Sequence, residues 1–116
     1  MAEGQVIPVK SLQQWKDQLK LGTDSKKLVA VDFTATWCGP CRFIGPVFAD
    51  IAKKTPNSIF LKVDVDEMRD IAEEWRVEAM PTFIFFKDGK AVDKVVGAKK
   101  EELEHAIAKH SASSSS

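Results

Sequence analysis

Two cysteines, Cys38 and Cys41, lie three positions apart and are the only cysteines among the 116 residues. They follow closely on an apolar run, residues 28–33, that is interrupted by one acid, Asp32. Such a run is typical of a central strand that is covered on both faces. Pro40, between the cysteines, suits the first turn of a helix, where a missing N–H group costs little. The pair is therefore predicted to lie where a buried strand passes into a helix.

This start of a helix suits redox chemistry. Spacing of three places both sulfurs on one side of the first turn, with Cβ atoms roughly 5–6 Å apart, and a small adjustment brings them into disulfide range. Free backbone N–H groups and the helix dipole favour an anion at Cys38, and the thiolate is the attacking species. We expect Cys38 to be the exposed, reactive thiol and Cys41 to lie inside the first turn.

Structural roles for the two cysteines are the alternatives. Secreted scaffolds close large loops with several widely spaced pairs, whereas a loop this short constrains the unfolded chain little. A structural zinc site needs about four ligands, and the only histidines, His105 and His110, lie in a predicted C-terminal helix. No metal site is expected. Two buried, unreactive thiols are the structural interpretation that stays open.

Composition indicates one globular domain. Hydrophobic residues make up 44% and charged residues 29% of the chain, and 17 basic residues balance 17 acidic ones. These values argue against global disorder, and the zero net charge gives no general attraction to nucleic acid or to an anionic membrane. We predict a single domain over residues 1–110 and a disordered serine-rich tail over residues 111–116.

The N-terminal segment bears on localisation. Residues 1–5 contain no basic region followed by an apolar run, as a secretory signal would, and they are too short and acidic for a transit peptide. No apolar run approaches the ~20 residues that span a bilayer. The expectation is a cytoplasmic protein.

Helical and strand patterns alternate along the chain and end in a hairpin. Ser11 and Gln14 have capping-box spacing, Gly22 is predicted to close that first helix, and Asp66 is predicted to cap the third. The second helix carries apolar residues four apart and contains Pro46. Together these elements predict a mixed sheet between helices. The predicted helices span residues 11–22, 36–55, 66–75 and 99–109; the predicted strands span residues 28–33, 58–64, 82–86 and 91–96; the four-apart residues are Phe43, Val47 and Ile51.

The residues around the cysteines resemble the thioredoxin family. Its motif is matched residue for residue by Trp37-Cys38-Gly39-Pro40-Cys41, and residues 31–36, 79–82 and 96–98 match as well. The similarity covers essentially residues 5–110 and is greatest to the cytosolic plant h-type branch. It implies an α/β thioredoxin fold, with a central mixed five-stranded β-sheet flanked by four α-helices.

The resemblance implies a protein-disulfide reductase that works by dithiol–disulfide exchange. Cys38 would attack a target disulfide as the nucleophile, and Cys41 would resolve the mixed disulfide. No cofactor would be bound, because electrons would come from NADPH through a thioredoxin reductase. The implied partners are this reductase and disulfide-containing target proteins, and the implied state is a monomer.

Two charged residues inside apolar strands are assigned roles by the same resemblance. Asp32 would lie buried beneath the sulfurs and exchange protons with Cys41, and Lys62 would lie near Asp32 and modulate it. From the sequence alone, the alternatives that stay open are a capping or edge carboxylate for Asp32 and a solvated edge lysine for Lys62.

A substrate surface is also implied, with Pro81 as the family's cis-proline facing the sulfurs and the backbone around it offered to an extended substrate. Core packing for Trp37 and a simple turn at Gly97 stay open as alternatives. The implied substrate-binding residues are Trp37, Gly39, Pro40, Met80, Pro81, Thr82, Gly97 and Ala98.

Related families and one different class compete with this interpretation. Protein disulfide isomerase domains share the fold but usually carry histidine at the position of Pro40, and glutaredoxins differ in the dipeptide between the cysteines. A redox-independent binding protein that uses the Pro81 surface is the alternative of a different class.

Overall fold

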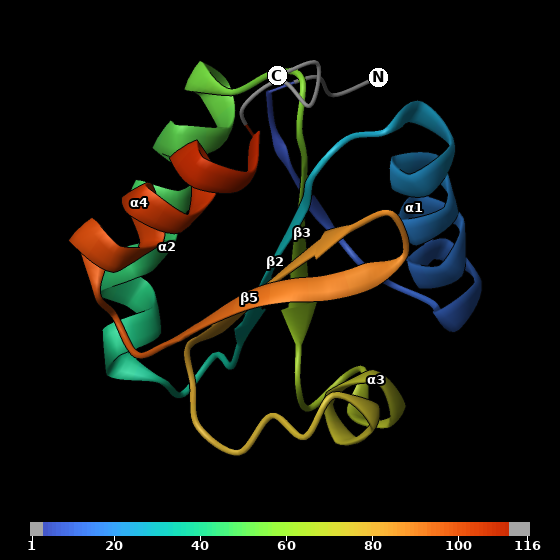
Figure 1. Cartoon of the computed structure of the whole chain (residues 1–116). Coiled ribbons are helices and arrows are strands. Elements are labelled where there is room, and N and C mark those ends of the chain that lie inside the picture. The colour runs from blue at the N-terminus through green and yellow to red at the C-terminus, as the bar shows by residue number, and fades with distance from the viewer. Residues whose placement is uncertain (1–3, 112–116) are drawn as a thin grey trace.

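A computed structural model describes residues 4–111, and its centre is a mixed sheet with the strand order β1-β3-β2-β4-β5 (Figure 1). β1 and β2 both run parallel to β3, whereas β4 is antiparallel to β2 and to β5. The implied five strands and four helices are confirmed. The strands are β1 (Val6–Pro8), β2 (Val29–Thr34), β3 (Ile59–Asp64), β4 (Thr82–Lys87) and β5 (Lys90–Val96); the helices are α1 (Leu12–Ser25), α2 (Gly39–Lys54), α3 (Arg69–Glu74) and α4 (Lys100–Ser111).

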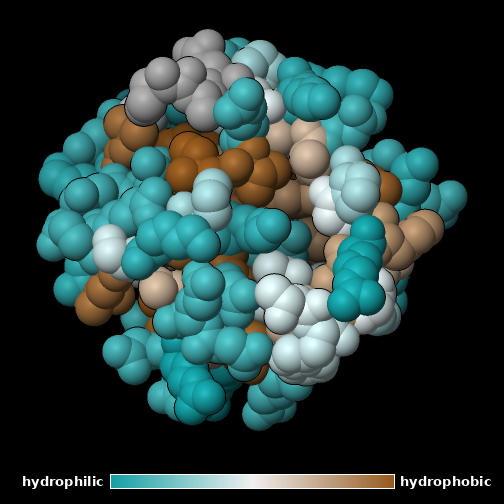
Figure 2. Space-filling model, turned by 180° about the vertical axis from the view of Figure 1, so that it is seen from behind, coloured by the Kyte–Doolittle hydropathy of each residue, from teal (hydrophilic) through white to brown (hydrophobic). Residues whose placement is uncertain are grey.

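The sheet separates two apolar layers. α2 and α4 cover one face and α1 and α3 the other, as Figure 1 shows. Side chains of a strand point alternately to the two faces, so Val31 and Phe33 pack with Trp15 of α1, while Ala30 packs with Phe48 of α2. From behind, hydrophilic residues cover much of the surface and hydrophobic residues form smaller areas between them (Figure 2). Over residues 4–111 no helix is long and apolar enough to span a membrane.

The centre of the sheet follows the sequence pattern, and its edge does not. β2 lies between β3 and β4, and its residues from Val29 to Phe33 are buried, as the apolar run predicts. β1 is not predicted by the pattern, because it has three residues and no alternation. It gains its partners only by pairing with β3, from Val6 opposite Phe60 to Pro8 opposite Lys62.

α1 begins as predicted and ends later. The hydroxyl of Ser11 accepts a hydrogen bond from the Gln14 N–H at 3.0 Å, which caps the helix. Gly22 does not close α1, which continues to Ser25 and ends at Lys26 in a left-handed conformation with φ 58°. Gly22 is buried instead against β2, where an added Cβ would collide with the Val29 side chain. This glycine serves the packing of helix on sheet.

α2 begins at Gly39, three residues later than predicted, because residues up to Cys38 form the turn that leaves β2. The stripe facing the core is also displaced by one residue. Ile44, Phe48 and Ala52 are buried, whereas Phe43 is exposed. Both stripes have four-residue spacing, so the sequence alone did not distinguish them.

The hairpin and the last helix agree with the predictions. Asp88 and Gly89 join β4 to β5 with φ values of 54° and 79°, the left-handed pair that a tight two-residue turn needs. The last helix, predicted over residues 99–109, is α4 and buries Leu103, Ala106 and Ile107. Ser111, assigned above to the tail, is the last residue of α4, and residues 112–116 of that predicted tail lie outside the described residues.

Candidate active site

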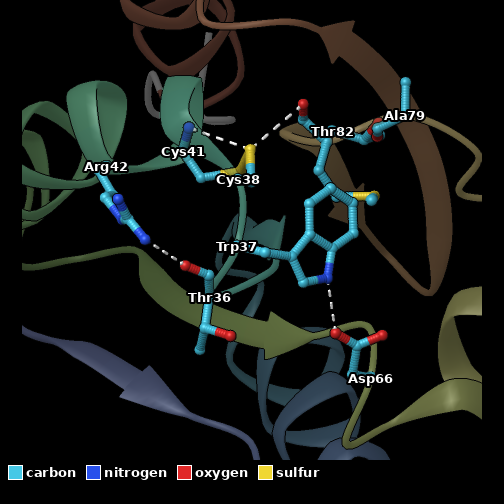
Figure 3. The surroundings of a disulfide bond; sticks show 9 residues. Thr36, Trp37, Cys38, Cys41, Arg42, Asp66, Ala79 and Thr82 are labelled. Carbon is cyan, nitrogen blue, oxygen red and sulfur yellow. Dashed lines mark hydrogen bonds between the residues drawn. A yellow bond between two sulfur atoms is a disulfide. The ribbon is translucent and has the colours of Figure 1, made fainter.

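The two cysteines form a disulfide at the N-terminus of α2 (Figure 3). Cys38 is the N-cap residue, its Sγ accepts a hydrogen bond from the Cys41 N–H at 3.2 Å, and the two Cα atoms lie 5.3 Å apart. A sulfur that receives a backbone N–H at a helix start is in the position that favours a thiolate after reduction. The predicted location of the pair, between a buried strand and a helix, is confirmed.

Local bonds fix the turn that presents the pair. The Cys38 N–H donates to the Ala35 carbonyl oxygen at 3.2 Å, and the Arg42 guanidinium donates to the Thr36 carbonyl oxygen at 2.9 Å. The first of these bonds closes the turn after β2, and the second ties the first turn of α2 back to it. Gly39 and Pro40 between the cysteines are both exposed.

Exposure does not separate the two cysteines as predicted. Cys38 is 4% and Cys41 5% exposed, so neither is an open thiol in the disulfide form. Their neighbours do differ. Cys38 Sγ lies 3.6 Å from the carbonyl oxygen of Met80, and the residue before Cys38 is Trp37, which is 63% exposed. Cys41 instead lines a cleft that also contains Asp32. Trp37 is therefore a surface residue, and the core-packing alternative is wrong.

The loop before β4 lies against the disulfide. The Met80–Pro81 peptide bond is cis, as the resemblance implied, and the Gly97 N–H donates to the Pro81 carbonyl oxygen at 2.8 Å. Gly97 has φ 102°, a conformation that residues with side chains rarely adopt. Gly97 is therefore a turn glycine, as the alternative predicted, and its N–H group also contacts this loop. The structure thus brings Met80, Pro81 and Gly97 together beside Cys38.

Three predicted substrate-binding residues are less exposed: Pro81 and Thr82 are buried, and Ala98 is half-buried. The Thr82 side chain is buried, its hydroxyl donates to the Ala79 carbonyl oxygen at 2.6 Å, and its backbone pairs within the sheet with Phe33 and Val96. Ala98 is half-buried against the apolar cluster beneath α4. Thr82 supports the loop that precedes it, and its side chain does not face solvent.

Asp32 is the unusual ionisable group of the site. Its side chain is 3% exposed, and among the described residues Oδ1 has no hydrogen-bond partner. Burial raises the pKa of Asp32 to about 7, against a smaller opposing effect of the Lys62 charge. A buried carboxyl that titrates near neutral pH can both accept and return a proton under working conditions. The edge-carboxylate alternative for Asp32 is wrong, because β2 is the middle strand.

A cleft of about 570 Å³ joins Asp32 to Cys41 and to the surface between α2 and the strands β1 to β3. Lys62 lies opposite Asp32 in the register of β3, and its exposed side chain lines the same cleft. β3 is an inner strand, so Lys62 is solvated without being at an edge. The cleft brings together the three predicted residues Cys41, Asp32 and Lys62. It is also lined by Arg42 and Asp64, which the sequence did not assign to the site.

Asp66 has a different role from the predicted one. It does not cap α3; its Oδ2 accepts a hydrogen bond from the Trp37 indole N–H at 2.9 Å (Figure 3). The turn before α3 uses Asp64, whose Oδ1 accepts the N–H groups of Asp66 and Glu67. The contact of Asp66 with Trp37 follows from the sheet, because β2 and β3 are parallel neighbours and the segments after the two strands meet at the same end of the sheet. A prediction that paired these two strands could have placed the two residues close together.

The site supplies the parts of a dithiol–disulfide couple and nothing resembling a metal centre. Between residues 4 and 111 no group of three or more His, Cys, Asp or Glu side chains could hold a metal ion. The chemistry on offer is a paired set of sulfurs, a helix N-terminus, and a buried proton acceptor reached through a cleft.

Comparisons with known proteins agree with this geometry. The family model described as Thioredoxin matches residues 6–109. A thioredoxin H-type protein from Picea mariana is 67% identical over 108 residues, which cover 93% of this chain and 86% of that protein. Thioredoxin H1 from Arabidopsis thaliana is 61% identical over 93% of this chain and 95% of its own. Among solved structures, thioredoxin NaTrxh from Nicotiana alata has a TM-score of 0.89 at 45% identity and covers 96% of both chains.

Proposed function

This chain belongs to the thioredoxin family, and we propose that it reduces disulfide bonds of other proteins through Cys38 and Cys41. Members of the family exchange dithiols for disulfides, and the plant H-type proteins are among its similar relatives. The observation that carries the proposal is the disulfide between Cys38 and Cys41 at the N-terminus of α2, beside the exposed Trp37.

The exchange takes two steps in the reduced protein. The Cys38 thiolate attacks one sulfur of a target disulfide, which forms a mixed disulfide and releases the other target sulfur as a thiolate that takes up a proton. The Cys41 thiolate then attacks Cys38, which restores the disulfide seen here and releases the second target thiol. Two electrons and two protons pass to the target in total.

Asp32 accepts the proton of Cys41 in the second step. The cleft supports this role, since it is lined by both side chains and gives water a path between them. The pKa of about 7 also supports it, because a stronger acid would not take the proton near neutral pH. Lys62, on the same cleft, helps to hold that pKa down and so modulates Asp32.

The target chain lies in extended form over the exposed surface beside Cys38. Trp37, Gly39, Pro40 and Met80 form this surface, supported by the contact of Gly97 with Pro81. An extended chain would use backbone groups around Met80, as strand addition does. Thr82 and Ala98 support this surface without facing the target: Thr82 holds the preceding loop in place through its hydrogen bonds, and Ala98 packs against the apolar cluster beneath α4.

The remaining parts of the proposal concern the source of the electrons, the cellular location and the oligomeric state. The protein binds no cofactor of its own, and an NADPH-dependent thioredoxin reductase regenerates the dithiol. It works in the cytoplasm, as a monomer, with one thioredoxin domain over residues 1–110. Resemblance to the h-type branch supports these assignments.

Insulin reduction tests the central proposal. The wild type should reduce insulin with dithiothreitol as electron source, and Cys38→Ser should be inactive. Cys41→Ser should accumulate mixed disulfides with target proteins that dithiothreitol dissolves, because the second attack is lost. Equal trapping by Cys38→Ser would contradict the assignment of the two roles, and a wild type no faster than Cys38→Ser would favour a redox-independent binding protein.

A comparison of two reductases tests the electron source. With NADPH, a thioredoxin reductase should support continuous turnover of insulin, and a ferredoxin-dependent reductase should support little. The opposite ranking would replace the NADPH-dependent reductase in the proposal and leave the exchange chemistry untouched.

A further inference from the structure

Large hydrophobic side chains are exposed at a few places in the described part of the chain, and Phe43 is an extreme case. Its side chain is 64% exposed, close to the 63% of Trp37, although it lies only two residues after Cys41. Single exposed apolar residues are normal on protein surfaces and need no explanation. Phe43 is of interest because it lies close in sequence to the reactive cysteines. The exposed residues of this kind are Leu12, Leu21, Trp37, Phe43, Val92 and Val96.

The faces of α2 show what Phe43 does not do. One stripe of the helix, from Cys41 to Ile44 and Phe48, is buried in the core. A second stripe, with Arg42, lines the cleft beside Asp32. Phe43 belongs to neither stripe, so it contributes to neither the core nor the proton path.

Phe43 instead shares a third stripe with Pro40 and Val47, three positions before it and four after it on the helix. Pro40 is exposed beside the disulfide, and Val47 packs against the apolar cluster that α2 shares with α4. These three side chains are uncharged, and the same face continues past them to Asp50 and Lys54, which pair with each other. The stripe is therefore a short apolar strip that continues the surface around the disulfide over the first turns of α2.

A protein substrate that reaches the disulfide comes close to the start of this strip. A protein that brings a sulfur in contact with Cys38 must lie over the first turn of α2, because Cys38 is the N-cap of that helix. Phe43 projects from the following turn, where a substrate that extends past its own cysteine along α2 would meet its ring. Aromatic side chains that become buried in such contacts are enriched among the residues that contribute most of the binding energy.

We propose that Phe43 is a specificity-determining residue, which contacts an apolar side chain beside the disulfide of a protein substrate. The inference rests on the proposed function and extends it from the reacting atoms to the class of target. Disulfides flanked by apolar side chains gain this contact, and small disulfides do not reach it. Phe43 takes no part in the exchange itself.

Two substrates of different size separate this role from the chemistry. In Phe43→Ala, KM for insulin reduction should rise about tenfold with kcat nearly unchanged, as the loss of one aromatic contact predicts. Reduction of DTNB, a small aromatic disulfide, should stay at the wild-type rate. Phe43→Leu should recover much of the insulin KM, because it restores an apolar side chain of similar reach.

Leu21→Ala is the matched control. Leu21 is 51% exposed but lies on α1, on the opposite face of the sheet, so its removal should change neither substrate. An unchanged insulin KM in Phe43→Ala overturns the inference and leaves the exchange chemistry standing. So does an equal loss with insulin and DTNB, which would assign Phe43 to the site itself. A wild type that reduces neither substrate overturns the proposed function and the inference with it.

A second copy of the chain is the other occupant that the strip would fit. Sedimentation of wild type and Phe43→Ala across a range of protein concentrations tests it, and both should be monomers. A dimer that only the wild type forms would assign Phe43 to self-association and overturn the inference.

Discussion

The two faces of the sheet are built from the same strands and differ in what they tolerate. Toward α1 and α3, β2 presents Val29, Val31 and Phe33, and Trp15 closes the layer with edge-on contacts to Phe33 and Phe86. Toward α2 and α4, the same strand presents Ala30 and then Asp32, next to a cleft open to solvent. One face is a continuous apolar core, and the other includes a buried acid.

The face toward α2 and α4 carries a group that lowers the stability of the fold and is proposed to take part in the reaction. A buried carboxyl without a hydrogen-bond partner opposes folding when it is charged, and Asp32 is such a group beside the disulfide. The closed face has no buried carboxyl among its described core residues; its buried polar atom without a partner is the uncharged indole nitrogen of Trp75. Substitutions on the two faces should therefore differ in sign as well as in size.

The largest effect is expected on the closed face. Trp15→Ala should lower the free energy of unfolding by about 3–5 kcal/mol, because it opens a cavity beside Phe33 and Phe86. Urea unfolding measures the loss, and DTNB reduction by the folded fraction should stay near the wild-type rate. A variant that keeps its stability and loses activity would show that the closed face takes part in the chemistry.

On the open face, Asp32→Asn should raise stability at alkaline pH. The folded pKa of about 7 exceeds the ordinary 3.8, so between these values the folded state binds more protons than the unfolded state. Stability of the wild type therefore falls as pH rises through this window, and above pH 7 the penalty reaches up to about 4 kcal/mol, since one pKa unit is about 1.4 kcal/mol. The variant lacks this penalty.

Urea unfolding of the wild type and Asp32→Asn from pH 4 to pH 9 measures that difference. The variant should gain on the wild type as the pH rises and should resolve mixed disulfides more slowly, because Cys41 loses its proton acceptor. A variant that is less stable at every pH, or more stable and fully active, would make Asp32 a structural residue.

A pair of glycines, one in the helix of each face, tests the contrast on a smaller scale. Gly22→Ala should destabilise by about 1–3 kcal/mol, since its Cβ would collide with Val29 and force the helix off the sheet. Gly45→Ala is the matched variant on α2. The Cβ that Ala would add at position 45 meets no other described residue within 4 Å, apart from its chain neighbours and the backbone of its own helix. Helix propensity would favour Ala at position 45 and the following Pro46 would oppose it, so a change under about 1 kcal/mol is expected. Thermal unfolding compares them, and equal losses would contradict the difference between the faces.

The smallest effect is expected at the exposed edge of the site. Asp66→Ala removes the acceptor of the Trp37 indole N–H, and its effect on stability should stay within about 0.5 kcal/mol because the residue is exposed. The indole N–H resonance of Trp37 should shift, and KM for insulin should rise slightly as the ring loses its fixed orientation. Asp66→Asn keeps an acceptor oxygen and should restore both values; an unmoved resonance in Asp66→Ala would remove Asp66 from the site.

Features that depend on a few neighbouring residues could be predicted from the chain alone. The Ser11 cap, the hairpin between the last two strands and the placement of Cys38 at a helix start are features of this kind, and each was predicted correctly. The apolar run of β2 likewise indicated a strand covered on both faces. The redox motif lies within this local range, which is why its position could be predicted before any tertiary contact was known.

The partners that distant residues meet depend on the tertiary fold. Gly22 was predicted to end a helix and is a packing contact with Val29, and Asp66 was predicted to cap a helix and accepts from Trp37, 29 positions away. β1 is a strand only because β3 offers it unpaired backbone groups. The exposed Phe43 and the buried Ile44 are adjacent in sequence, and the pattern of α2 fits either stripe. Burial is a property of what packs on a helix or strand, so the chain folded as a whole assigns it.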